Sequence, residues 1–110
     1  MSKGFIYLLK CVSDYETCYK IGFTKNKNIN KRILNLQTGN QDKITHVDSF
    51  ETNYGVILEK AIHNFYAHKN IRNEWFELDI QDVVNFPETC QKIEKNFDAL
   101  KDNPYFLSSK

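Results

Sequence analysis

Four side chains in the first sixty residues are of the types that phosphodiester hydrolysis requires: Tyr7, Lys20, Arg32 and Glu59. A carboxylate can hold a hard metal ion, a cation can stabilise the charge that develops on phosphate oxygens, and a phenol can assist the attacking water. Tyr7 and Lys20 lie in two strand-like runs that can pair and so face one pocket. The pattern therefore indicates the groups of a small phosphodiesterase.

The strands that must position these residues are visible in the apolar runs. Residues 4–12 and 18–23 are predicted strands, and the polar segment between them favours a hairpin with a loop of several residues. Residues 44–51 alternate loosely and are predicted to form a third strand. Residues 73–78 are a short aromatic run, interpreted as a strand or as an extended packing segment.

Helical periodicity separates and follows these strands. A polar break at residues 24–28 precedes an amphipathic helix that ends near Gly39, with apolar residues Ile29, Ile33 and Leu36. Residues 53–68 have the clearest period, with one apolar face made by Tyr54, Leu58, Ala61, Ile62 and Phe65. A final helix over about 88–102 follows Pro87 and turns inward Cys90, Ile93, Phe97 and Leu100.

The order of these elements, β-β-α-β-α-(β)-α, predicts an α/β fold of the α+β type. We expect a small mixed three-stranded sheet flanked by helices. The 110 residues are near the common size of one domain, so residues 1–110 are predicted to form a single domain. Its core is expected over 4–80, with a peripheral tail over 103–110.

The net charge of +1 conceals a basic first third. Residues 1–37 carry seven Lys and Arg against two Asp and Glu, a net charge of +5. Residues 38–76 carry four against five, and residues 77–110 carry four against seven. The basic segment holds three of the four candidate residues and suits an anionic ligand such as a phosphodiester backbone. A solvated lysine surface is the alternative interpretation.

Composition also narrows the cellular setting. No window approaches the roughly 18 apolar residues of a membrane span, and the first residues lack the features of a signal peptide. We expect a cytoplasmic protein, or a nuclear one in a eukaryotic or viral host, with no membrane partner. Cys11, Cys18 and Cys90 indicate neither a disulfide framework nor a zinc site. Cys11 and Cys18 can approach across the hairpin, and we interpret them as reduced core cysteines.

Several segments, in order, resemble the GIY-YIG nuclease superfamily, and most closely its branch of small phage, viral and fungal open-reading-frame-type DNA-binding domains. The similarity covers about residues 4–80. The matching pieces are FIY at 5–7, YKIGFT at 19–24, Arg32 with LQTG at 36–39, LEKAIH at 58–63 and NEWF at 73–76.

This resemblance implies a metal-dependent endonuclease, a hydrolase that cleaves DNA by in-line attack of water with one Mg²⁺ or Mn²⁺ ion. It implies that Glu59 binds the metal and that Arg32 pairs with non-bridging phosphate oxygens. Tyr7 would contact or deprotonate the water. A free phenol is a weak base, so this role needs Arg32, Lys20 or the metal nearby.

The chain departs from the superfamily at two places. Lys20 stands where the second signature tyrosine is expected, and an alternative register would use Tyr19 instead. Adjacent strand residues point to opposite faces, and we favour Lys20. The first helix lacks the histidine of several relatives, and Gln37 is the nearest polar substitute. His63, four residues after Glu59, is predicted to be a partner that orients this carboxylate.

Two other functions stay open at this point. The chain can be a DNA-binding module of the same fold that has lost cleavage. It can also be a protein-interaction domain with an exposed aromatic patch of Tyr15, Tyr54 and Trp75. The sequence does not determine the oligomeric state.

Overall fold

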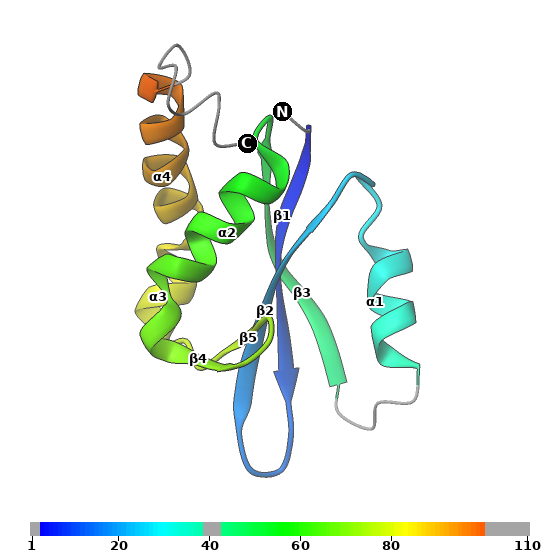
Figure 1. Cartoon of the computed structure of the whole chain (residues 1–110). Helices are drawn as coiled ribbons and strands as arrows, with labels where there is room; N and C mark the ends of the chain where they lie inside the picture. The colour runs from blue at the N-terminus through cyan, green and yellow to red at the C-terminus, as the bar shows by residue number, and fades with distance from the viewer. Residues whose placement is uncertain (1–2, 39–42, 101–110) are drawn as a thin grey trace.

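The computed structural model describes residues 3–38 and 43–100, and its centre is an antiparallel sheet. In these ranges the sheet has five strands in the order β3-β1-β2-β5-β4 (Figure 1). The strands are β1 (Gly4–Val12), β2 (Thr17–Thr24), β3 (Lys43–Thr52), β4 (Asn70–Arg72) and β5 (Trp75–Phe76). The α/β class fits, but the prediction of three strands in a mixed sheet was wrong. Strands of two or three residues are too short to show a period of two.

Apolar and aromatic residues make β1 an interior strand of the sheet. It pairs with β2 on one side and with β3 on the other, and the register places Tyr7 opposite Gly22 and Leu9 opposite Lys20. The hairpin loop closes through a 2.9 Å bond from the Ser13 N–H to the Glu16 carbonyl. Because the hairpin fixes this register, it also fixes which side chains of β1 and β2 are neighbours.

Alternation along β1 and β2 divides the interior into two cores. Ile6 and Leu8 lie in the larger core with residues of the second and last helices, whereas Tyr7 and Leu9 lie in a smaller one with Ile29. The two faces of a strand alternate with a period of two, so each residue of β1 is committed to one core. Tyr7 therefore lies on the same side of the sheet as the first helix.

The helices follow the same division. They are α1 (Asn30–Gln37), α2 (Gly55–Phe65), α3 (Ile80–Val84) and α4 (Phe86–Leu100), with a 3-10 turn η1 (Ala67–Lys69) after α2. Figure 1 shows α1 on one side of the sheet and the other three on the opposite side. Pro87 lies in the first turn of α4, where its missing N–H costs nothing. The predicted ends at Gly39 and 101–102, and the tail 103–110, lie outside the described residues.

Most of the predicted apolar faces are confirmed. Ile29, Ile33 and Leu36 pack in the smaller core; Tyr54, Leu58, Ile62, Cys90, Ile93 and Phe97 pack in the larger one. Phe65 is 55% exposed and Leu100 is 43% exposed, so their inward prediction was wrong. The helical period of α2 stops at Phe65, and the backbone then turns so that Tyr66, 1% exposed, fills the core.

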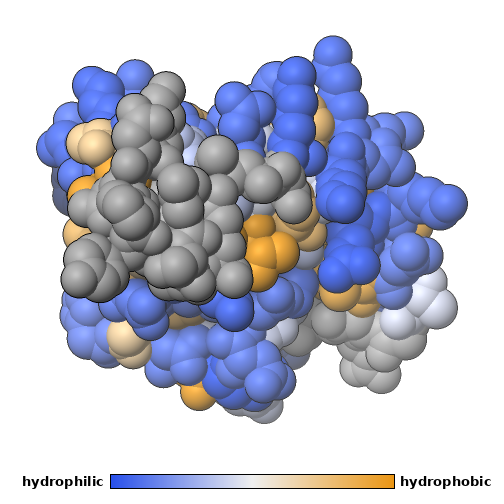
Figure 2. Space-filling view, turned by 45° about the horizontal axis from the view of Figure 1, so that its top comes forward, coloured by the Kyte–Doolittle hydropathy of each residue, from blue (hydrophilic) through white to orange (hydrophobic). Residues whose placement is uncertain are grey.

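Polar contacts connect α4 to the end of β3. The Thr52 hydroxyl donates to Glu94 over 2.6 Å, and the Tyr54 hydroxyl donates to the Asp98 carboxylate. That hydrogen bond, together with burial, raises the pKa of Tyr54 to about 12. The expected patch of Tyr15, Tyr54 and Trp75 does not form, because Tyr54 is only 5% exposed while Tyr15 is 97% exposed. The face in Figure 2 is mainly hydrophilic, with small separate apolar areas.

The three cysteines are buried and form no disulfide within the described residues, as predicted. Cys11 lies directly opposite Cys18 in the hairpin. Burial raises the pKa of the Cys18 thiol to about 11, with a contribution from Cys11, and burial raises that of Cys90 to about 12. Thiols of this kind are weak nucleophiles near neutral pH, so a role in packing explains them. No helix in the described part of the chain is long and apolar enough to cross a membrane.

Candidate active site

Tyr7 and Gly22 form the floor of the site. The Tyr7 side chain is fully buried, and a Cβ atom added to Gly22 would lie 2.3 Å from the Tyr7 Oη and 2.4 Å from its Cζ. The phenol ring therefore occupies the space that any larger residue at position 22 would need. This explains the glycine of the YKIGFT segment as a requirement of close packing, because the β2 backbone itself accepts other residues.

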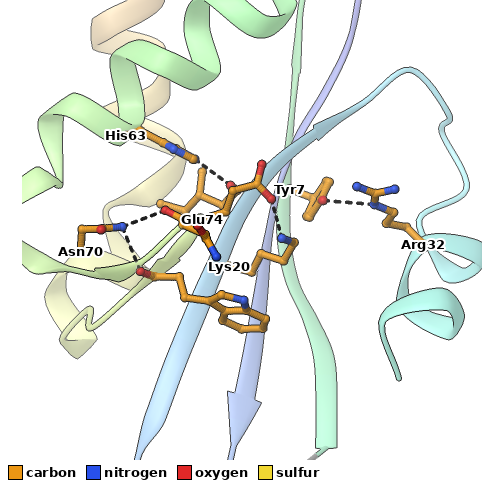
Figure 3. A network of polar contacts seen from close by, with 9 residues as sticks. Tyr7, Lys20, Arg32, His63, Asn70 and Glu74 are labelled. Atoms are coloured by element: carbon orange, nitrogen blue, oxygen red, sulfur yellow. Dashed lines mark hydrogen bonds and ion pairs between the residues drawn. The ribbon is translucent and has the colours of Figure 1, made fainter. Parts of the chain in front are cut away.

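Arg32 of α1 contacts the same phenol. Its Nε donates to the Tyr7 Oη over 3.4 Å. Figure 3 draws this contact as a dashed line. The hydrogen bond to Tyr7 is the largest cause of a raised pKa for Arg32, and the negative charges of Glu74 and Glu59 add to it. The guanidinium is therefore a permanent cation whose field is shared with two carboxylates. Because its side chain is exposed at the surface, it remains accessible to a ligand.

Lys20 lies two residues before Gly22 and on the same face of β2. It is only 8% exposed, and its ammonium group forms a 2.5 Å ion pair with Glu74 Oε2. The ammonium also lies 5.5 Å from the centre of the Trp75 ring, a distance typical of a cation–π contact. Figure 3 shows the Lys20 and Glu74 side chains directed at one another. Lys20 is thus a buried cation with a matched partner, as burial of a charge requires.

Glu74 reaches Lys20 because of the turn between β4 and β5. Asn73 has a φ of 49°, in the left-handed region that asparagine tolerates better than most residues. The Glu74 carbonyl accepts a 3.1 Å bond from the Ile21 N–H, which fixes the turn against β2. Sequence reasoning did not include Glu74 in the site. Glu74 belongs to the NEWF segment of the family resemblance, which was the available indication. Its contact with Lys20 spans 54 positions and depends on the register of β5 against β2.

Glu59 and His63 approach from α2, on the other side of the sheet. The Glu59 carboxylate is half-buried and accepts a hydrogen bond from the Phe23 backbone. Burial raises the pKa of Glu59, as does the charge of Glu74, while His63, Lys20 and the Phe23 bond oppose the shift. His63 Nε2 lies 2.8 Å from the Ile21 carbonyl, and because a carbonyl only accepts, Nε2 is the donor.

These contacts complete the outer edge of β2. β5 pairs with β2 only at Tyr19 and Lys20, so the strand continues beyond its neighbour. From Ile21 onward, Glu74, His63 and Glu59 supply the hydrogen-bonding partners that another strand would have supplied. The edge therefore acts as the junction where residues from both sides of the sheet meet.

Tyr19 takes no part in this junction. Its ring is 8% exposed and packs in the larger core, whereas the neighbouring Lys20 lies on the α1 side with Trp75. Tyr19 and Lys20 therefore point to opposite faces of β2, as strand alternation predicted. The geometry keeps Lys20, and not Tyr19, beside Tyr7 and Gly22.

The oxygen donors fit a hard cation held only in part by protein. Glu59 and Glu74 are near enough for the charge of one to raise the pKa of the other, and carboxylates are the ligands that Mg²⁺ and Mn²⁺ prefer. In the described ranges no group of three or more His, Cys, Asp or Glu side chains is arranged to hold a metal. An ion here would take its remaining ligands from water and substrate, as Mg²⁺ commonly does.

The fold and the junction together define a small α+β domain with a polar site at the end of one sheet edge. Residues 4–95 match the T5orf172 domain, and the chain belongs to this family. It is a phage-type domain associated with nuclease-like folds of the GIY-YIG and HNH kinds, and it is compatible with a nuclease-like or DNA-binding module. No curated protein and no solved structure matches the chain.

Proposed function

We propose that the domain is a GIY-YIG-type endonuclease that hydrolyses DNA with one Mg²⁺ or Mn²⁺ ion. The supporting observation is convergence: Tyr7, Lys20, Arg32 and Glu59 come from four separate elements and meet at the outer part of β2. Arg32 is an exposed residue whose guanidinium contacts the buried Tyr7, an arrangement that a randomly placed surface charge would not produce.

The roles follow from the groups and their partners. Arg32 binds the non-bridging oxygens of the target phosphate and stabilises the charge that develops on them. Glu59 would hold the ion, and Glu74, whose charge acts on Glu59, is a further carboxylate. When bound, the ion supplies charge neutralisation at the phosphate and acidifies a coordinated water. Lys20 keeps a second positive charge beneath the site.

Tyr7 positions the attacking oxygen. Because Arg32 donates to Tyr7 Oη, the phenol keeps its own proton to share with another acceptor. The ring is fully buried, so the hydroxyl is held in one place without a loss of side-chain entropy when substrate binds. Because Tyr7 has no exposed surface, its hydroxyl would contact the nucleophilic water once Arg32 turns from the Tyr7 Oη to the phosphate.

Nicking of supercoiled plasmid by purified protein tests the proposal, with Mg²⁺, Mn²⁺ or EDTA present. We expect metal-dependent nicking that is lost in Glu59→Ala and Glu59→Gln and falls about 100- to 1,000-fold in Arg32→Ala, the range for loss of one stabilising donor. Glu88→Gln, an exposed carboxylate on α4, is the matched control and should nick normally. Nicking that persists in both Glu59 variants would refute the site.

One observation favours a second function, a DNA-binding module that no longer cleaves. The residue at the second signature position is Lys20, and its ammonium is already paired with Glu74 at 2.5 Å. A site with this residue engaged can retain phosphate binding while its chemistry is lost. Plasmid that is shifted on a low-salt gel but never nicked, in any metal, would establish this alternative.

A further inference from the structure

A hollow of about 140 Å³ opens beside Arg32, between the end of β2 and the body of α1. Its lining residues are Thr24, Asn26, Asn28, Lys31, Arg32 and Asn35, which we call the asparagine hollow. Arg32 belongs to both this hollow and the junction at β2. A ligand in the hollow therefore shares one cation with a ligand at the candidate active site.

The chemistry of the asparagine hollow is cationic and rich in donors. Of its six lining residues none is acidic, and Lys31 and Arg32 are positively charged. Both cations are exposed, so their charge is available to a ligand. An anion is the complementary partner of such a wall.

The loop that forms one wall is tied through its side-chain oxygens. The Asn26 Oδ1 accepts from the Asn28 N–H over 2.9 Å, and the Asn28 Oδ1 accepts from the Asn30 N–H over 3.0 Å. The Thr24 Oγ1 accepts from the Asn26 N–H over 3.1 Å. These bonds hold the Asn26 and Asn28 amides in place, and their NH₂ groups can donate to a ligand.

The hydrogen bonds of these two asparagines favour a phosphate over a base as the ligand. Asparagine recognises adenine with both ends of its amide, the oxygen accepting from N6 and the nitrogen donating to N7. The oxygens of Asn26 and Asn28 are each held on a backbone N–H, so these amides are less suited to the two-ended contact that adenine needs, and they can donate through their NH₂ groups. Phosphate oxygens are acceptors only, and they carry the charge that Lys31 complements.

We propose that the asparagine hollow binds a backbone phosphate of DNA, adjacent to the phosphate that Arg32 contacts in the active site. The inference rests on the proposed nucleic-acid function and deepens it, since it names a subsite that holds the strand without reading its sequence. Lys31 supplies the charge, Asn35 supplies a neutral donor, and Arg32 bridges the two phosphates. Contacts of this kind position a strand and carry no base information.

Salt dependence of binding tests the subsite directly. A short fluorescein-labelled duplex and its single strand are titrated with protein in EDTA, so that cleavage cannot interfere, over a range of NaCl concentrations. Loss of one phosphate contact reduces the slope of log K against log salt by about 0.9 for duplex and about 0.7 for single strand. From 50 to 200 mM salt, Lys31→Ala should therefore lose about 3.5-fold less duplex affinity than the unmodified protein.

Two further variants control for general effects. Asn35→Ala should weaken binding while leaving the slope unchanged, because it removes a donor and no charge. Lys95→Ala removes one exposed charge from α4, on the other side of the sheet, and should leave affinity and slope unchanged. The Lys31→Ala effect should be equal on A·T-rich and G·C-rich strands.

The outcomes separate this inference from the proposed function. If the unmodified protein binds DNA but Lys31→Ala has the same slope as the unmodified protein, the subsite is refuted and the function stands. A Lys31→Ala effect that differs between A·T-rich and G·C-rich strands also refutes it, since the hollow would then read bases. If the unmodified protein binds no DNA, both proposals fall together. If the protein nicks plasmid and Lys31→Ala has the same salt slope as the unmodified protein, the proposed endonuclease function is supported and the phosphate subsite is refuted.

Discussion

Replacement of Gly22 by alanine is expected to destabilise the domain, although alanine is normally the better residue in a strand. Gly loses more conformational freedom on folding, so in open space Gly→Ala would stabilise by about 0.5–1 kcal/mol. At position 22 the new methyl group would lie 2.3 Å from Tyr7 Oη, 2.4 Å from Cζ and 2.9 Å from Cε1. Whether Gly22→Ala lowers or raises the stability therefore tests whether the Tyr7 ring packs directly against Gly22.

The magnitude follows from how far the ring must move. Ordinary contacts begin near 3.4 Å, so Tyr7 must shift by about 1 Å within a fully buried environment. Overpacking of this size costs about 1–3 kcal/mol in close-packed interiors. That range lowers the ratio of folded to unfolded protein by about 5- to 150-fold. The Tyr7–Arg32 contact would move with the ring, and a shift of about 1 Å can cost about 100-fold in rate.

Urea denaturation of four proteins measures the effect: the unmodified chain, Gly22→Ala, Tyr7→Leu and the double variant. Leucine lacks the three atoms that the methyl group would meet, so Gly22→Ala should be neutral or stabilising in the Tyr7→Leu background. Gly4→Ala is the matched control. Its added methyl would lie 2.6 Å from the Thr24 carbonyl, a backbone atom that Tyr7→Leu does not remove.

Equal or greater stability of Gly22→Ala in the unmodified background would refute the packing described for the site. So would a cost that persists unchanged when Tyr7 is leucine, because the clash would then lie elsewhere. Nicking assays on the same proteins add an independent measurement. Gly22→Ala should lose activity at temperatures where the protein remains folded.

Three more predictions concern other buried groups. A double-mutant cycle of Lys20→Met and Glu74→Gln should give a coupling of about 0.5–1 kcal/mol, since solvent screens the partly exposed Glu74, and zero coupling would contradict the ion pair. Tyr54, with its pKa raised from 10.0 to about 12 by Asp98, contributes stability that is present below pH 10.0 and lost as pH rises toward 12. Alkaline titration of tyrosinate absorbance in the unmodified chain and Tyr54→Phe checks this, and identical stability profiles would count against it. Cys90, whose pKa burial raises to about 12, should react with a thiol reagent only when the protein unfolds. Rapid labelling of native protein at neutral pH would show that this thiol is accessible.

The local pattern of the sequence predicted the parts of the structure that local physics determines. The long strands, the helices and most of their apolar faces follow from periods of 2 and 3.6 residues, and alternation alone separated Tyr19 from Lys20. The four candidate site residues were chosen by their chemical types and by the resemblance to the superfamily. The structure brings them together, while their chemical roles stay predictions.

Features that depend on distant contacts could not be read in this way. The strands β4 and β5 are three and two residues long, and they exist because β5 pairs with the edge of β2 and β4 pairs with β5. Glu74 joins the site through its ion pair with Lys20, which is 54 positions away in the sequence. Phe65 and Tyr66 are both aromatic, and only the turn after α2 decides which one enters the core.

The completed edge of β2 also bears on the solubility of this domain. An unpaired strand edge is a template on which a strand of another molecule can add, and folded proteins block such edges. Here the blocking groups are Glu59 and His63 together with the Glu74 turn, the same groups that form the site. Substitutions at the proposed site that shorten these side chains would expose the backbone groups of Ile21 and Phe23 to self-association. Glu59→Gln, which keeps an oxygen acceptor for the Phe23 N–H, is therefore the variant best suited to testing the proposed complex with DNA.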